Sequence, residues 1–173
     1  MDKLARRTFL AGATATGLMA SAPAYATRVG EPAPPFSIFT FDWKKIQYAQ
    51  MRGKVIIVNF WATWCGPCRE ELPTLSAYYK QHEAEGLLIF PVKAGDDKPV
   101  RELAPWSKLV SFPLVWHLDG NGYGVINNEY PSNFVIDRAG VLRYAEAGAF
   151  TMEGLDQIVT PLLAAPMPAT AAT

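Results

Sequence analysis

The chain has 173 residues, of which 50% are hydrophobic and 18% are charged, and its formal net charge is zero. A chain of this length can build one globular domain with a substantial core. The balance of charge indicates neither a nucleic-acid partner nor a disordered chain. Two cysteines are too few for a disulfide-rich scaffold, and with only two histidines they leave little for a structural zinc site.

The first 26 residues have the pattern of an export signal. A basic stretch precedes an apolar run from Phe9 to about Ala22, and the small-residue motif Ala24-Tyr25-Ala26 follows. This order predicts a signal peptide that is cleaved after Ala26. The letters RRTFL at residues 6–10 resemble a twin-arginine signal, and a general secretory signal is the alternative. We therefore expect a periplasmic protein, in a compartment where disulfides persist.

The pattern after residue 26 predicts one α/β domain over residues 27–163. A proline-rich lead-in over 27–35 precedes a strand at 36–41, and the β-branched run 55–60 predicts a strand buried on both faces. A helix is expected over 66–85, with a kink at Pro73. Its apolar stripe comprises Leu72, Leu75, Tyr79 and His82.

The second half of this domain begins with a strand at 87–92, a polar loop at 95–98 and a short helix at 100–109. Leu103, Trp106 and Leu109 are expected to face inward from that helix. Residues 110–129 fit no single element apart from a turn at 119–122, and 133–137 and 141–145 predict a hairpin. Thr151 is expected to cap a last helix that Pro161 limits, and residues 164–173 to be disordered. This order predicts a mixed β-sheet flanked by helices on both faces.

The candidate chemistry lies in Trp64-Cys65-Gly66-Pro67-Cys68, between the strand at 55–60 and the helix at 66–85. Two residues between the cysteines, in the first helical turn, bring both sulfurs to one side within bonding distance. The helix N-terminus favours an anion, so Cys65 is the expected thiolate, and Cys68 is placed to attack a neighbouring sulfur. Pro67 suits the first helical turn, and Gly66 keeps the approach open.

This arrangement predicts thiol–disulfide exchange. The Cys65 thiolate attacks a substrate disulfide and Cys68 resolves the mixed disulfide, which leaves the pair oxidised and the substrate reduced; the reverse sequence oxidises a substrate. A static surface disulfide or half of a metal site is the alternative for such a pair. The preceding Trp64, the Gly-Pro insert and the position between a strand and a helix favour the redox interpretation.

Residues 59–73, NFWATWCGPCREELP, resemble the active-site segment of the thioredoxin superfamily. Within it they are most similar to the exported TlpA/ResA-like thiol–disulfide oxidoreductases. Residues 30–36 are similar to the opening segment G-x-x-A-P-x-F of that group, and 111–113 and 134–140 match its later landmarks. The resemblance covers about residues 29–163 and implies a thioredoxin-like fold.

The resemblance also implies a proline opposite the cysteines. In that superfamily a cis-proline faces the Cys-x-x-Cys pair and helps to bind the substrate backbone, and Pro131 matches it. Tyr130 and Asn133 depart from the small or β-branched residue and the threonine that are usual beside this proline. Residues 121–129 likewise depart from the usual helix and turn, so the substrate contacts at this rim differ from the family pattern.

Two polar positions bear on proton transfer. Asn59 stands where thioredoxins themselves have a buried aspartate, so this position cannot supply the proton acceptor. Glu71 matches an acidic residue that ResA-like proteins place near the active site, and a partly buried carboxylate there could take a proton during exchange. A solvated helix charge, as expected for Glu70, is the alternative for Glu71.

The leading interpretation is a periplasmic reductase of protein disulfides. The Gly-Pro insert resembles the reducing members of the superfamily, which commonly serve cytochrome c maturation or copper-site assembly. Such a reductase needs a membrane electron donor, and we expect a monomer with no cofactor or metal. The alternative is a copper-binding module in which Cys65, Cys68 and His117 bind Cu(I). A thiol peroxidase is a third, weaker interpretation, because Thr63-Trp64-Cys65 only loosely fits its Thr-x-x-Cys pattern.

Overall fold

The computed structural model describes residues 27–95 and 97–167. The expected export signal at residues 1–26 lies outside the described residues, as does the part of the expected disordered tail from 168 to 173. Within the described part of the chain, no helix has the length and apolar character needed to cross a membrane.

The chain forms one seven-stranded mixed sheet, with strand order β2-β1-β5-β4-β3-β6-β7. The strands β3, β4 and β5 are parallel to one another, and the remaining pairs are antiparallel. The expected mixed α/β architecture is confirmed. The strand bounds are β1 Phe36–Thr40, β2 Lys45–Gln47, β3 Val55–Trp61, β4 Leu87–Lys93, β5 Val115–Gly120, β6 Ser132–Ile136 and β7 Leu142–Ala147.

The strands β2 and β5 were not predicted. β2 is only three residues long and has no buried residue, so it carries no hydrophobic signal. β5 is buried only at Val115. Its ladder pairing with β4 is limited to the single pair Val92–Val115, whereas it pairs along its length with β1. The predicted turn at 119–122 begins too early, because the strand continues to Gly120 against Phe36.

The central strand β3 is buried at all seven positions. Its odd-numbered residues, such as Ile57, face the helix α1, and its even-numbered apolar residues face a second core on the other side of the sheet. The two cores lie on opposite faces of one sheet, as the β-branched run predicts. The carboxyl end of β3 therefore leads directly to the N-terminus of α1.

The helix α1 (Gly66–His82) and the 3-10 helix η2 (Glu83–Glu85) together span the predicted 66–85. Tyr78, rather than Tyr79, is the fully buried residue of its fourth turn. The Tyr78 hydroxyl donates to the carbonyl of Leu155 at 3.4 Å and lies 2.8 Å from the Thr160 hydroxyl. His82 packs on Tyr78, with ring centroids 4.3 Å apart, and its Nδ1 bonds to the exposed carboxylate of Glu85.

The predicted short helix at 100–109 is confirmed over residues 100–108, but only its first four residues are α-helical. It consists of α2 (Val100–Leu103) and the 3-10 helix η3 (Ala104–Lys108), because Pro105 lacks the N–H that would continue the α-helix. Leu103 is buried as predicted, but Leu109 is 65% exposed, so its inward orientation was wrong.

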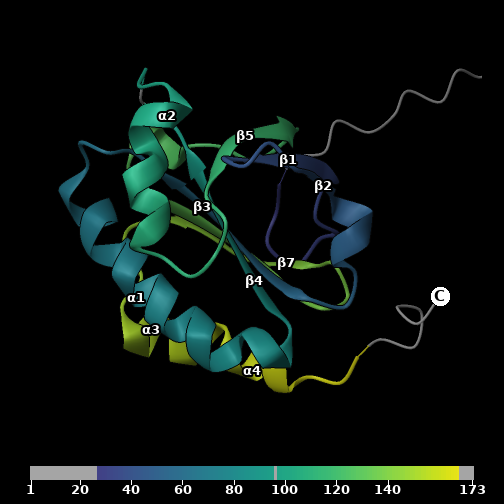
Figure 1. Ribbon diagram of the computed structural model, residues 1–173. Coiled ribbons are helices and arrows are strands. Elements are labelled where there is room, and N and C mark those ends of the chain that lie inside the picture. Colours follow the sequence, from purple (N-terminus) through teal and green to yellow (C-terminus); the bar gives the residue numbers. More distant parts are fainter. Residues whose placement is uncertain (1–26, 96, 168–173) are drawn as a thin grey trace, which may run out of the picture.

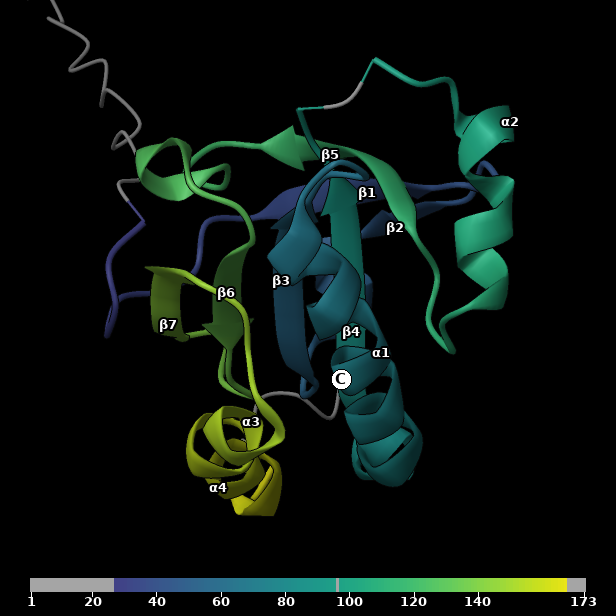
Figure 2. The same cartoon turned by 90° about the vertical axis from the view of Figure 1, so that its left-hand side faces the viewer.

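The last helix is capped as expected, since the Thr151 hydroxyl accepts from the N–H of Gly154. Pro161 divides the predicted helix into α3 (Met152–Ile158) and α4 (Thr160–Ala164). Figure 1 shows α1, α3 and α4 on one side of the sheet, and Figure 2 shows α3 and α4 beside the lower end of α1. The other face is covered by the 3-10 helix η1 (Tyr48–Met51), which contributes Met51 to the second core, and by the lead-in around Ala33.

Candidate active site

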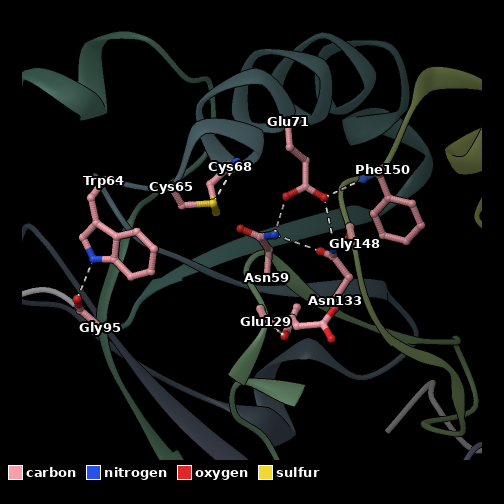
Figure 3. The surroundings of a disulfide bond; sticks show 11 residues. Asn59, Trp64, Cys65, Cys68, Glu71, Gly95, Glu129, Asn133, Gly148 and Phe150 are labelled. Atoms are coloured by element: carbon pink, nitrogen blue, oxygen red, sulfur yellow. Dashed lines mark hydrogen bonds between the residues drawn. A yellow bond between two sulfur atoms is a disulfide. The ribbon is translucent and has the colours of Figure 1, made fainter. Parts of the chain in front are cut away.

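The two cysteines lie where the central strand meets the first helix. Cys65 is the N-cap residue of α1, and it forms a disulfide with Cys68, whose Cα atom is 5.3 Å away. The N–H of Cys68 donates to the Cys65 sulfur at 3.1 Å. The predicted pairing at the start of a helix is therefore confirmed (Figure 3).

The environments of the two sulfurs differ. Cys65 is 4% exposed, whereas Cys68 is 0% exposed in the core that α1 builds against β3. When the bond opens, the free N–H groups of the helix N-terminus face Cys65 and favour its thiolate. A side chain at Gly66 would meet no atom within 4 Å, and Pro67 is exposed, so the chain leaves space above Cys65.

An aromatic pair stands beside the disulfide. The Trp64 ring is 60% exposed, donates from Nε1 to the carbonyl of Gly95 at 2.8 Å, and contacts Tyr130 edge-on with centroids 5.2 Å apart. Gly95 has a φ of +64°, and a Cβ there would lie 2.5 Å from the Tyr130 hydroxyl. The next tryptophan upstream, Trp61, is completely buried and contributes nothing to this rim.

The bond between Tyr130 and Pro131 is cis. Pro131 is buried and comes directly before β6, whose first residue, Ser132, pairs with Phe60 near the end of β3. Because β3 and β6 are antiparallel, the start of β6 and the carboxyl end of β3 lie at the same edge of the sheet. The carbonyl of Pro131 accepts from the N–H of Gly148, which has a φ of +123°. The structure thus places Pro131 at the edge from which the cysteine segment begins.

The segment before Pro131, residues 121–129, does not form the helix and turn that are usual in the superfamily, as the sequence indicated. It contains only the 3-10 turn η4 (Ile126–Asn128), in which Asn127 and Asn128 have positive φ values of 52° and 59°. Asparagine tolerates this left-handed region better than most residues. The Ser132 hydroxyl closes the turn, since it accepts from the N–H of Ile126 and donates to the carbonyl of Glu129.

Glu71 is a buried carboxylate and not a solvated helix charge. It lies one turn after Cys68 on α1 and is 1% exposed, whereas Glu70 is exposed. Its Oε2 accepts from Asn59 Nδ2 at 2.7 Å, and its Oε1 accepts from Asn133 Nδ2 at 2.7 Å and from the backbone N–H of Phe150 at 2.8 Å. Figure 3 shows these donors around the carboxylate.

Burial dominates the titration of this carboxyl. It disfavours the charged form and raises the pKa of Glu71 from its ordinary 4.5 to about 7, although the three hydrogen bonds oppose this effect. The pKa of Glu71 therefore lies near neutral pH, which is the value at which a general acid or base is most effective.

The polar partners of Glu71 were not predicted as a group. Asn59 and Asn133 pair directly across β3 and β6, and Asn59 Nδ2 donates to Asn133 Oδ1 at 2.9 Å. Asn59 is the single polar residue of the buried strand β3, and Asn133 follows Ser132 in the buried strand β6; this was the signal available in the sequence. The sequence could not show that the two strands are neighbours with these residues in register.

The structure does not assemble the proposed copper ligands. His117 is exposed on β5, between the rings of Phe39 and Trp116. Among the described residues, no three His, Cys, Asp or Glu side chains come together as a metal site would need. His117 is therefore part of a surface aromatic group on β1 and β5.

Comparison with known proteins agrees with this geometry. A family model described as the AhpC/TSA family matches residues 29–145. The chain belongs to the AhpC/TSA family. The thioredoxin-like protein YneN of Bacillus subtilis is 32% identical over 134 residues, which are 74% of this chain and 76% of that protein. The thiol-disulfide oxidoreductase ResA of Geobacillus thermodenitrificans is 31% identical over 135 residues, which are 76% of each chain.

Solved structures show the same fold. A thiol:disulfide interchange protein of the thioredoxin family from Chlorobium tepidum is 29% identical and superposes with a TM-score of 0.66, covering 82% of this chain and 99% of that chain. With its paired Cys65 and Cys68, this member of the AhpC/TSA family is a ResA-like thiol–disulfide oxidoreductase.

The raised pKa of Glu71 predicts a pH-dependent stability. Between pH 4.5 and 7 the folded protein holds a proton on Glu71 that the unfolded chain releases, so stability falls as the pH rises through this window. From pH 4.5 to pH 7, we expect the free energy of unfolding of the oxidised wild type to fall by about 3 kcal/mol more than that of Glu71→Gln. Urea denaturation at a series of pH values measures this difference. The exposed control Glu70→Gln should keep the wild-type dependence, and a wild-type curve parallel to that of Glu71→Gln would contradict the prediction.

Proposed function

We propose that the protein is a periplasmic reductase of protein disulfides. The observation that carries this proposal is the asymmetry of the pair, in which Cys65 caps α1 and keeps an exposed fraction of 4%, whereas Cys68 is 0% exposed. An attacking sulfur must reach a substrate, whereas a resolving sulfur needs to reach only Cys65. The Gly66-Pro67 insert, similar to that of reducing members of the superfamily, supports the reducing direction.

The first step forms a mixed disulfide. The Cys65 thiolate attacks one sulfur of the substrate disulfide, a bond forms between these two sulfurs, and the other substrate sulfur leaves as a thiolate. The N–H of Cys68 and the N-terminus of α1 stabilise Cys65 as an anion before this attack and whenever it leaves again.

The second step releases the substrate. The Cys68 thiol gives its proton to the Glu71 carboxylate, its sulfur bonds to Cys65, and the bond between Cys65 and the substrate breaks. The substrate leaves as a thiolate, having gained two electrons in all, and the pair is left as a disulfide. Glu71 suits this role because it lies one turn from Cys68 and its pKa is raised to about 7.

Substrate binding is assigned to the edge of the sheet around the disulfide. Pro131 lies at the edge of the sheet where the cysteine segment begins, and the exposed Trp64 provides an apolar surface next to Cys65. Disulfide-containing proteins are the proposed substrates, and a membrane protein is the proposed electron donor that returns the pair to its dithiol form. The export pattern of residues 1–26 supports a periplasmic location, and cytochrome c maturation or copper-site assembly is the corresponding kind of pathway.

A trapping experiment tests the two cysteine roles. Cys68→Ser should accumulate a mixed disulfide between Cys65 and a disulfide substrate such as insulin, because no second sulfur is left to resolve it. Cys65→Ser should accumulate none, because the remaining sulfur is buried. Non-reducing electrophoresis and mass spectrometry of the adduct measure this. Equal trapping by the two variants would contradict the assigned order of attack.

The reduction potential of the pair tests the direction of electron flow. A reductase should have a potential near that of thioredoxin, about −270 mV, and an oxidant one near that of DsbA, about −120 mV. We expect the value to lie at the thioredoxin end. Equilibration with a series of thiol buffers, followed by alkylation and mass spectrometry, gives the potential. A value near that of DsbA would overturn the reductase assignment and leave the exchange chemistry intact.

The pH dependence of the resolving step tests the role of Glu71. With Cys65 loaded as a mixed disulfide, the rate of release should rise through about pH 7 in the wild type as Glu71 becomes ionised. Glu71→Gln should slow release by about 10²-fold above this pH and remove the rise. Rapid-mixing kinetics with a chromogenic thiol as the leaving group gives both profiles. Glu70→Gln serves as the control, and an unchanged profile in Glu71→Gln would exclude proton transfer to this carboxylate.

A further inference from the structure

One atom of the buried polar cluster has no hydrogen-bond donor. Asn59 is 0% exposed in the middle of β3, and its Nδ2 donates to Glu71 Oε2 at 2.7 Å and to Asn133 Oδ1 at 2.9 Å. Its Oδ1 is also buried, and no donor within the described ranges 27–95 and 97–167 reaches it. Buried carbonyl oxygens in folded proteins almost always have a partner, so this exception needs an explanation.

The partners of Asn59 fix the orientation of its amide. Both Glu71 Oε2 and Asn133 Oδ1 are acceptors, so the amide must turn its NH₂ group toward them. The opposite orientation would place Oδ1 against a carboxylate oxygen and an amide oxygen, and would leave both without a donor. Asn133 is held in turn, since its Nδ2 donates to Glu71 Oε1 and to the carbonyl of Gly148 at 3.0 Å.

The free oxygen is directed at the redox pair. As an odd-numbered residue of β3, Asn59 lies on the face of the sheet that α1 covers, the face whose core contains both cysteines. In Figure 3 the NH₂ end of the Asn59 side chain points toward Glu71 and Asn133, and the Oδ1 end points toward the sulfurs of Cys65 and Cys68. In the disulfide form these sulfurs carry no hydrogen, so they cannot donate to Oδ1.

Reduction creates the missing donor. Two electrons and two protons convert the disulfide into two thiols, and Cys65, at the helix N-terminus, is the one that readily releases its proton. Cys68 is completely buried and retains its S–H, which is a hydrogen-bond donor. We propose that Asn59 Oδ1 is a redox-dependent acceptor, unpartnered in the disulfide form and bonded to the Cys68 S–H in the dithiol form.

This bond has two consequences for the exchange reaction. It favours the dithiol form, because only reduction satisfies the buried oxygen. It also holds the Cys68 thiol beside Asn59, whose NH₂ group binds Glu71, so the sulfur is oriented in the dithiol form; the S–H then leaves Oδ1 when Cys68 gives its proton to Glu71. The inference applies to either direction of electron flow and does not depend on the reductase assignment.

Infrared spectroscopy of the Cys68 thiol tests the proposal. In Cys65→Ala only one S–H group remains, and hydrogen bonding lowers its stretching frequency. We expect a low-frequency band in Cys65→Ala that moves to the higher frequency of a free thiol in Cys65→Ala/Asn59→Leu, a variant of similar volume. The control Cys65→Ala/Asn133→Thr removes an amide from the same cluster but keeps Asn59, and its band should stay at low frequency. No movement with Asn59→Leu, or equal movement in both variants, would overturn the proposal.

A measurement on the unaltered chain decides the matter even where Asn59→Leu does not fold. The carbon-13 chemical shift of the Asn59 side-chain carbonyl should change between the oxidised and reduced proteins, because its oxygen gains a donor. The side-chain carbonyl of Asn133 already accepts a hydrogen bond, so it is the internal reference and should change much less. Identical Asn59 shifts in the two redox states would refute the bond.

Discussion

The pairing of β3 with β6 holds the two halves of the site together. β3 ends at the cysteine segment, and β6 begins at Pro131, so their antiparallel register brings both to one edge of the sheet. The same register sets Asn59 opposite Asn133, which are the two side chains that bind Glu71 from the sheet. All twelve residues of these two strands are buried, and a shift by one residue would turn the asparagines to the opposite face.

The cluster around Glu71 balances two opposing effects. Removing a carboxylate from water disfavours its charge, and three donors on Asn59, Asn133 and Phe150 offset part of that penalty. The result is a carboxyl group with a pKa of about 7, one helical turn from the buried sulfur of Cys68. The donors come from β3, β6 and the segment after β7, so the pKa of Glu71 depends on three separate parts of the chain.

The rim of the site joins segments from three parts of the chain. The Tyr130 ring, next to Pro131, packs against Trp64, and Trp64 donates to the carbonyl of Gly95. Three loops are thereby joined beside the disulfide: the cysteine loop, the loop after β4 and the turn before β6. The exposed Trp64 thereby forms an aromatic surface next to Cys65.

The sequence by itself determined the central strand, the long helix, the hairpin and the redox pair. These features depend on local patterns: a continuous β-branched run, a capped helix, a turn with glycine, and two cysteines in the first helical turn. The sequence did not determine how the helices continue at Pro105 and Pro161, because a proline can end a helix or merely divide it. The strands β2 and β5 carry too little buried surface to leave a pattern.

Only the tertiary structure decided how the polar residues combine. Glu71 had two possible roles on the helix, and burial against β3 and β6 determined which environment it has. Asn59 and Asn133 are 74 positions apart, and their contact exists only because two strands pair in one register. His117 had the right chemistry for a metal ligand, but β5 places it among surface aromatic rings. Spacing along the chain fixes which groups share one helix or strand, whereas burial and hydrogen bonding between distant strands depend on the folded sheet.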